Sequence, residues 1–270
     1  MKTLFFFVGV SLLQNGFGQS LHLMTAPAVV RTGAYSNVIT NALYFTANQA
    51  ALRTVKHFGA ALYGEKRFLL QELSFYHLAV TQPAGDGAFG LQLAFAGNTD
   101  YNASKIGVAY GRKLGERVGA GVQFNYWNQG IRGYGNIAQV TIEGGLMFQF
   151  SDVFQAGLQL CNPIGVVFGK NSEKLPAVYT IGAGYQPSQN LNITAELIKT
   201  EQLPLAIQAG TAYRFAPKLW AKAGINSRTA AFYVAAGYQL NVFGIEAVGS
   251  VHPQLGLSPG LMITYNAMDK

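Results

Sequence analysis

Charged residues are the scarcest class in this chain. Only 11% of its 270 residues are Asp, Glu, Lys or Arg, and half are hydrophobic, whereas a typical soluble domain is about 25% charged. A cytosolic enzyme of this size would need more charge on its surface, so the composition argues against that class. Intrinsic disorder is excluded as well, because disordered chains contain too few apolar residues to form a core.

Long apolar runs are also missing. Beyond the first fifteen residues, no stretch approaches the roughly 20 consecutive apolar residues that a membrane-spanning helix needs. The chain nevertheless contains 32 glycines and has a mean hydropathy of +0.18. A hydrophobic, charge-poor chain without spanning helices favours the transmembrane β-barrel, the other structure that satisfies its backbone hydrogen bonds within a bilayer.

Cysteine and clustered basic residues are scarce too. A single cysteine, Cys161, excludes an internal disulfide, and no Cys/His group has the spacing of a zinc site. The net charge of +7 comes from Lys and Arg residues that are scattered singly, not from a block or stripe of the kind that binds nucleic acid. We therefore expect no nucleic-acid partner and assign the positive charge to a surface that faces anionic lipid.

The N-terminus has the pattern of a signal peptide. Lys2 precedes an apolar run over residues 4–13, and Gly16 and Gly18 form a small-x-small cleavage site. We predict that residues 1–18 are removed and that the mature chain is exported. The alternative is a short buried strand.

From His57 onward the chain alternates between apolar and polar or small residues. Val122 and Phe124, for example, alternate with Gly121 and Gln123. A period of two predicts β-strands with one apolar face. The predicted strands are residues 57–65, 68–82, 87–97, 102–112, 118–128, 138–150, 153–161, 176–186, 190–199, 203–215, 218–226, 230–241, 243–252 and 259–266.

The connections between these fourteen strands sort by length. Those after even-numbered strands are short, whereas those after odd-numbered strands include the three long ones, 129–137, 162–175 and 253–258. Transmembrane barrels have short periplasmic turns and longer external loops, and a soluble sandwich would hide its apolar faces. We predict an antiparallel transmembrane barrel over residues 57–270.

The predicted inward face contains many small residues, so the lumen should be wide. A barrel of fourteen strands already exceeds the roughly eight whose side chains fill the interior. We predict that residues 19–56 fold inward as a plug; the alternative is a periplasmic tail. The small inward residues are Gly107, Ala109, Gly119, Gly121, Gly145, Gly157, Gly182, Gly184, Gly210, Ala235 and Gly237.

Ionisable side chains are sparse on this inward face. Their mixed signs favour ion pairs with the plug or neighbouring strands over ion transport, which would need a ring of one sign. A transport role stays open, because ionisable groups facing a cavity in a membrane protein are functional candidates. The lumen-facing candidates are Glu72, Glu143, Glu196, Arg214, Lys222, Glu246 and His252.

Glu246, Ser250 and His252 share one face of one predicted strand and have the residue types of a catalytic triad. Alternate residues lie roughly 7 Å apart along a strand, too far for the direct hydrogen bonds of a triad. Phosphate loops, metal motifs and nucleophile turns are absent as well. We therefore expect a non-enzyme without catalytic, cofactor-binding or metal-binding residues.

Aromatic residues and one loop are further candidates. Tyrosines near the predicted strand ends suit an aromatic girdle, whereas Trp127 and Trp220, if inward, could stack on a ligand. The predicted loop 162–175 is the longest, and we expect it to contact a partner or ligand. Its candidate residues are Phe168, Lys170 and Lys174.

Several segments resemble one family of outer-membrane proteins. RTGAYSNVITNALYFTANQAAL at 31–52 is similar to the N-terminal signature of the FadL superfamily. The closer likeness is to PorV/PorQ-like proteins of Bacteroidetes. It is carried also by IGVAYGRKL at 106–114, GAGVQFNY at 119–126, GLQLCNP at 157–163, GAGY at 182–185, AELIK at 195–199 and VHPQLGL at 251–257. One departure is Asn48-Gln49-Ala50, where the family has Asn-Pro-Ala.

The resemblance implies a fourteen-stranded barrel with an N-terminal plug in the Gram-negative outer membrane, in contact with its lipid. Likeness to PorV-type members implies an accessory or cargo-handling role in type IX protein secretion, with secretion or envelope proteins as partners. Likeness to FadL-type members implies passive transport of a small hydrophobic molecule. A structural subunit of an envelope complex is the third hypothesis.

Overall fold

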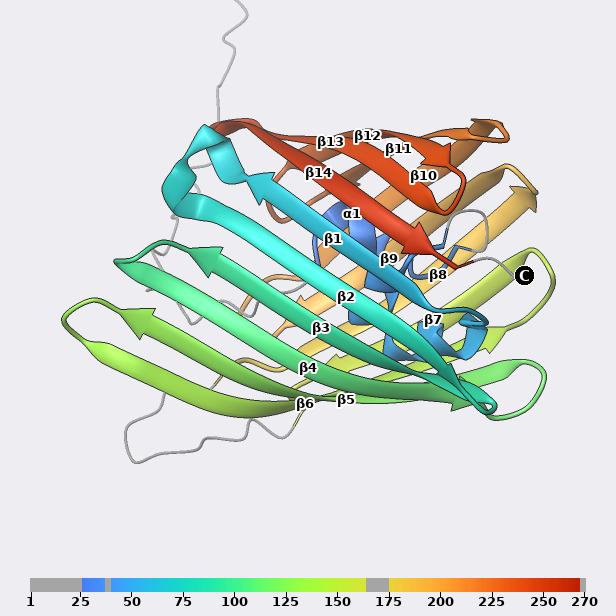
Figure 1. The fold of residues 1–270 in the computed structure, drawn as a ribbon, viewed down its shortest axis with the longest axis horizontal. Helices are drawn as coiled ribbons and strands as arrows, with labels where there is room; N and C mark the ends of the chain where they lie inside the picture. The colour runs from blue at the N-terminus through green and yellow to red at the C-terminus, as the bar shows by residue number, and fades with distance from the viewer. Residues whose placement is uncertain (1–25, 37–39, 164–174, 268–270) are drawn as a thin grey trace, which may run out of the picture.

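The fold is a closed β-barrel (Figure 1). The computed structural model describes residues 26–36, 40–163 and 175–267. Fourteen antiparallel strands follow one another around the barrel, and β1 pairs with both β2 and β14 to close it. The predicted all-β, fourteen-stranded architecture is therefore confirmed. The strands are β1 Gly59–Lys66, β2 Ser74–Ala84, β3 Gly87–Gly97, β4 Tyr101–Lys113, β5 Val118–Ile131, β6 Gly135–Gln149, β7 Phe154–Cys161, β8 Val178–Ser188, β9 Leu191–Thr200, β10 Ala206–Ala216, β11 Leu219–Asn226, β12 Ala231–Leu240, β13 Phe243–His252 and β14 Gly256–Asn266.

The helical elements are all short. Among the described residues, no helix is both long and apolar enough to cross a membrane. In the part of the chain that the structure describes, three helical elements precede the first strand, and two connect β1 to β2. They are α1 Ala28–Arg31, η1 Ala42–Thr46, η2 Gln49–Thr54, η3 Arg67–Leu69 and η4 Gln71–Leu73.

Each strand presents one apolar face to the outside, as its alternation predicts. In β5, Phe124 and Tyr126 are exposed, whereas Gln123 and Asn125, which alternate with them, are buried in the interior. The same period recurs around the barrel and leaves large apolar side chains on the outer wall of strand after strand. An apolar belt of this extent is stable against lipid rather than water.

The two ends of the barrel differ in their connections. The connections after even-numbered strands are residues 85–86, 114–117, 150–153, 189–190, 217–218 and 241–242. Those after odd-numbered strands are residues 67–73, 98–100, 132–134, 162–177, 201–205, 227–230 and 253–255. We call the end with the odd-numbered connections the loop end and the opposite end the turn end. The two longest connections, 67–73 and 162–177, lie at the loop end as predicted. The sorting holds only in part, because 98–100, 132–134 and 253–255 of the loop end are shorter than 114–117 and 150–153 of the turn end.

Two of the predicted long loops are instead tight turns. The alternation of β5 and β6 continues to residues 132–134, where Gly133 and Gly135 have φ of 83° and 92°. Gly256, with φ of 88°, likewise lets β14 start earlier than predicted. Glycine adopts these left-handed angles without steric cost, so each hairpin closes in three residues.

The start of the second strand was predicted wrongly. β2 begins at Ser74 rather than at residue 68, because Phe68 and Leu69 have φ of 54° and 61° and the chain turns through η3 and η4. Glu72 therefore lies in η4, exposed and beyond the end of the wall. The expectation that Glu72 lines the lumen is wrong.

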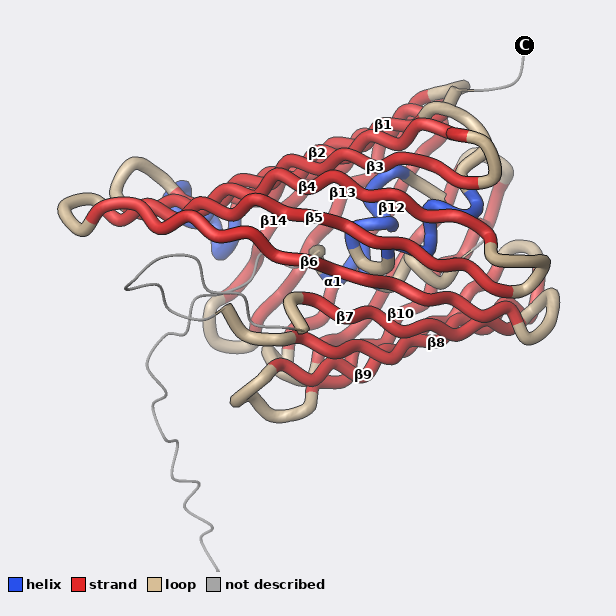
Figure 2. The backbone as a smooth tube through the Cα atoms, turned by 90° about the horizontal axis from the view of Figure 1, so that it is seen from below, coloured by secondary structure: helices blue, strands red, loops and turns tan. Residues whose placement is uncertain are grey.

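The interior of the barrel is occupied by the chain that precedes β1. Figures 1 and 2 show α1 enclosed by the strands, and η2 contacts β3, β4, β5 and β6. The fully buried residues of this segment include Val30, Leu43, Ala47, Ala50 and Leu52. We call the described residues 26–36 and 40–56 the plug. The predicted signal peptide, residues 1–18, lies outside the described residues.

Candidate functional site

Two helical turns of the plug, η1 and η2, begin at asparagines. The Asn41 side chain accepts a hydrogen bond from the backbone N–H of Leu43 at 2.9 Å, and Asn48 accepts one from Ala50 at 3.0 Å. Such N-caps satisfy amide groups that a short helix leaves unpaired. The Asn48 amide also donates to the backbone carbonyls of Leu146 and Leu158. One side chain thus starts η2 and anchors it to β6 and β7.

Glycines on the inner wall provide the space for the plug. A Cβ added at Gly182 or Gly184 would overlap Tyr35, and one at Gly121 or Gly145 would overlap the turn that begins at Asn48. Whereas Gly107 and Gly237 make room for wall side chains, most of the inward glycines predicted from the sequence thus lie where plug and wall approach most closely. Their role is to let the plug pack directly on the wall, at the density of a protein interior.

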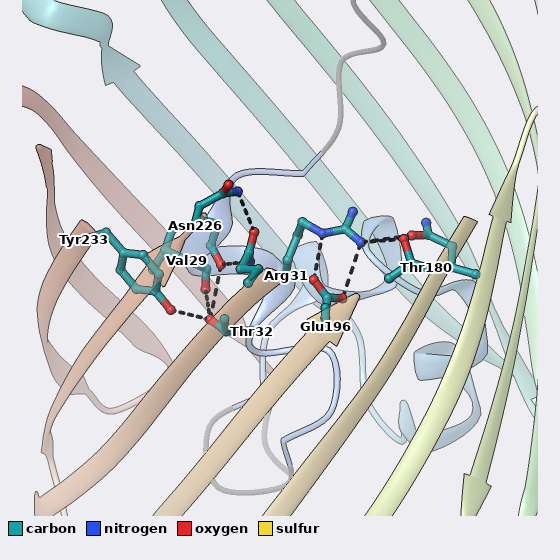
Figure 3. Close-up of polar contacts among 10 residues, drawn as sticks. Val29, Arg31, Thr32, Thr180, Glu196, Asn226 and Tyr233 are labelled. Atoms are coloured by element: carbon teal, nitrogen blue, oxygen red, sulfur yellow. Dashed lines mark hydrogen bonds and ion pairs between the residues drawn. The ribbon is translucent and has the colours of Figure 1, made fainter. Parts of the chain in front are cut away.

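One ion pair fixes α1 to the wall (Figure 3). The Arg31 guanidinium contacts Glu196 of β9, with Nε 2.9 Å from Oε2, and also donates to Thr180 Oγ1 at 3.1 Å. The Arg31 and Glu196 side chains are 5% and 0% exposed. A buried charge without its partner is strongly destabilising, so this pair selects one docked position of the plug.

A second contact holds η2. Gln49 Nε2 donates to Glu143 Oε2 at 2.8 Å, and the other oxygen of Glu143 accepts from Lys105 Nζ at 2.6 Å and from Asn125 Nδ2 at 3.0 Å. Both oxygens of this buried carboxylate are therefore satisfied. Gln49 occupies the first position of η2, so the residue that starts this helical turn also bonds the wall.

A third contact holds η1. Lys222 Nζ of β11 donates to Tyr44 Oη at 3.1 Å and to Glu246 Oε1 at 3.0 Å, and Trp220 Nε1 donates to the other oxygen of Glu246. Burial raises the pKa of the Tyr44 hydroxyl, more than nearby Lys222 lowers it. Tyr44 therefore stays protonated and accepts the hydrogen bond as a neutral group.

The predicted lumen-facing residues thus fall into two groups. Glu143, Glu196, Lys222 and Glu246 are buried and lie in the contact network of the plug. Arg214 lies near the turn end, where it lines a cavity. His252 lies at the loop end, where its Nδ1 accepts from the backbone N–H of Gln254 and Leu255. The loop candidates Phe168, Lys170 and Lys174 lie outside the described residues.

Lys105, Arg31 and Gln49 are among the participants that were missed from the sequence. Lys105 lies on the inward face of β4, in phase with Gly107 and Ala109, so its direction could have been inferred from the alternation. Arg31 and Gln49 carry no comparable signal. Their partners lie 165 and 94 residues away in the sequence, and neither short helix has a period that predicts which side chain meets the wall.

On the loop-end side of these ion pairs, the lumen has an apolar layer. It is built around Trp127, which is 3% exposed and whose Nε1 has no hydrogen-bond partner among the described residues. Ile198 and Cys161 pack in the same cluster. We call this layer the apolar cluster; its members are Ala103, Trp127, Cys161, Leu175, Val178, Ile198 and Ala206.

On the turn-end side lie two cavities of about 320 and 300 Å³, and Thr40 and Asn41 of the plug line both. The first cavity is bordered by apolar side chains that include Phe45, Val55 and Phe58. The second is more polar and is lined by Arg214, Trp220 and Glu246, among others. The described residues contain no group of three or more His, Cys, Asp or Glu that could hold a metal ion.

Comparison with known proteins identifies the fold. The sequence matches no protein-family profile and no curated relative. The structure is similar to that of the Pseudomonas putida toluene transporter TodX, with a TM-score of 0.63 and 12% identity over 92% of this chain and 99% of that one. A Pseudomonas aeruginosa FadL homologue gives 0.62 and 12% over 86% and 96%. The Ralstonia pickettii toluene transporter TbuX gives 0.59 and 12% over 85% and 94%.

The ion pair between Arg31 and Glu196 yields a first prediction. Replacing Glu196 with Leu leaves the Arg31 charge buried without its partner, so we expect the free energy of unfolding to fall by about 3–5 kcal/mol. The double variant R31M/E196L should regain most of that loss, because an apolar pair is as well suited to a dry site. Denaturant titration of the barrel in detergent micelles or lipid vesicles measures both. Strictly additive losses would contradict the pairing.

The glycine wall yields a second prediction. Gly182→Val should push Tyr35 out of its place and loosen the plug, which increases ion conductance through the barrel in a planar bilayer. Gly249→Val is the matched control, because a Cβ there meets only Leu257 Cδ1 at 3.7 Å. Adding Tyr35→Ala to Gly182→Val should return the conductance toward that of Tyr35→Ala alone. Equal conductance in the two single valine variants would disprove the packing role.

Proposed function

We propose that this chain resides in a Gram-negative outer membrane and passively transfers small apolar compounds across it. The single observation that carries the proposal is the apolar cluster around Trp127, on the loop-end side of a lumen closed by a plug. A pore for polar solutes needs a continuous wet passage, whereas buried ion pairs here hold protein across the lumen. An apolar compound gains free energy where water is excluded.

The chemistry of the cluster suggests the substrate class. The members of the cluster are aliphatic, aromatic or thiol-bearing, so a hydrocarbon-like compound in contact with them would lose no hydrogen bonds. The Trp127 ring offers a face for stacking an aromatic compound. Proteins of the same fold are described as toluene transporters and as a monoaromatic hydrocarbon channel. By analogy of fold, we propose a monoaromatic or similarly small hydrophobic substrate.

The proposed path runs from the loop end to the turn end. The compound first occupies the apolar cluster, then passes the plug and leaves by the turn-end cavity lined by Phe45 and Phe58. Arg31, Tyr35 and Asn48 lie between these two regions and separate them in the docked state. Transfer on this path requires the plug to shift, and the compound moves only down its concentration gradient.

The second candidate is a PorV-like accessory or cargo-handling role in type IX secretion. It is supported by the order and spacing of the sequence segments that resemble PorV/PorQ-like proteins, which cover nearly the whole mature chain. Secretion or envelope proteins would then be partners, and a structural subunit of an envelope complex is a variant of the same idea.

Affinity purification from native membrane in mild detergent separates the candidates. Secretion machinery that co-purifies supports this role, whereas a bound hydrophobic molecule without protein partners supports transport.

Tryptophan fluorescence tests the proposed substrate site. The chain has two tryptophans, Trp127 and Trp220, so each can be silenced in turn. We expect toluene to change the emission of the wild-type protein in detergent and of Trp220→Phe, but not of Trp127→Phe. In proteoliposomes, Ile198→Asn should slow toluene uptake by about tenfold, because a polar group in the apolar cluster costs about 1–3 kcal/mol of binding. Ile198→Val is the matched control.

A toluene response that persists in Trp127→Phe would place the site elsewhere in the barrel. Uptake that is the same in Ile198→Asn and Ile198→Val would separate the apolar cluster from the transport path. Intact folding of each variant is checked by the shift in electrophoretic mobility on heating.

A further inference from the structure

The outer wall has a groove where the barrel closes. It has a volume of about 770 Å³ and runs across β14, β1 and β2 toward the loop end. These three strands lie side by side in Figure 1. The groove belongs to the lipid-facing surface and is separate from the plug, the apolar cluster and the turn-end cavities.

A glycine creates the groove. Gly64 lies on the outward face of β1 and pairs with Tyr76 of β2 on one side and Leu261 of β14 on the other. Where Gly64 has no side chain, the wall is hollowed between large apolar neighbours. Leu62, Tyr76, Leu261 and Ile263 are between 41% and 52% exposed and form its sides. A narrow apolar trough of this kind fits a hydrocarbon chain.

A cation lies at the loop end of the trough. Lys66 is exposed and continues the outward row of Leu62 and Gly64 along β1. No hydrogen bond or ion pair of the Lys66 ammonium group is found among the described residues. Its neighbour Glu65 also lines the groove. The Glu65 carboxylate accepts from the Tyr63 hydroxyl at 2.7 Å and pairs with the Arg67 guanidinium, so Arg67 neutralises this acid.

The connection beside Lys66 is apolar, which places it against the membrane as well. Leu69, Leu70 and Leu73 of the β1–β2 connection are 57%, 50% and 41% exposed. Glu72 is the only acid of this connection, and it is not among the residues that line the groove. The groove thus has apolar sides and an apolar β1–β2 connection beside it. At its loop end lies Lys66, whose ammonium group has no hydrogen bond or ion pair among the described residues.

We propose that this groove binds a phosphate-bearing membrane lipid, with one acyl chain along Gly64 and the phosphate on Lys66. A lipid supplies both chemistries with the right separation, because its charged headgroup lies at the membrane surface and its chains run inward. A basic side chain near the surface contributes about 1 kcal/mol to binding anionic lipid. The inference rests on the proposed membrane location but not on the proposed transport.

Native mass spectrometry of the purified protein in mild detergent tests the site. The probes are phosphatidylglycerol and phosphatidylcholine with the same acyl chains. We expect phosphatidylglycerol to bind more tightly, and Lys66→Gln to reduce its affinity about fivefold, the factor that corresponds to the loss of one such cation. Gly64→Leu should fill the trough and weaken the binding of both lipids. Leu261→Trp fills the trough from the other strand and should act in the same way.

Two control variants match these changes elsewhere on the outer wall. Lys199→Gln removes an exposed lysine near the loop end of β9, and Gly144→Leu fills an outward glycine of β6 whose added Cβ would meet only Gly121 O at 3.9 Å. Both should bind phosphatidylglycerol as the wild type does.

Equal affinity in Lys66→Gln and wild type, or binding displaced by inorganic phosphate alone, would overturn the proposal. Lipid binding is measured in the absence of toluene. A loss of lipid binding can therefore be distinguished from a failure of the proposed toluene transport.

Discussion

A barrel of fourteen strands encloses more space than its own inward side chains can fill, and this constraint governs the whole structure. The chain meets it with the plug, the segment that precedes the first strand. Filling the lumen with protein buries the carboxylates of Glu143, Glu196 and Glu246, and burial of a charge is costly unless it is paired. Each of the three therefore contacts a cation, and the plug supplies Arg31 for one of them.

The same contacts decide what the lumen can transmit. The ion pairs and the glycine wall hold α1 and η2 against opposite parts of the barrel, so the polar groups of the lumen satisfy one another instead of water. Apolar space is left on both sides of this layer, as the cluster around Trp127 and the turn-end cavity beside Phe45. The arrangement is suited to solutes that need no hydration and unsuited to ions.

The strands could be predicted from the sequence far better than the site. β3 and β13 have the predicted bounds because their alternation is unbroken, and Glu143, Glu196, Lys222 and Glu246 were found by their phase within it. The start of β2 could not be found, because left-handed angles at Phe68 and Leu69 leave no pattern in the residue types. The plug residues that contact the wall carboxylates could not be predicted either, because Arg31 meets Glu196 across 165 residues, through a docking that only the folded barrel defines.

Comparing two fluxes through the same protein tests most directly whether the plugged barrel passes apolar compounds and excludes ions. Proteoliposomes that contain the wild-type chain are loaded with an ion-sensitive dye and exposed first to a potassium gradient and then to toluene. We expect toluene uptake above that of protein-free liposomes, without a matching ion flux. An ion flux typical of an open pore, or toluene uptake no faster than in protein-free liposomes, would contradict this expectation.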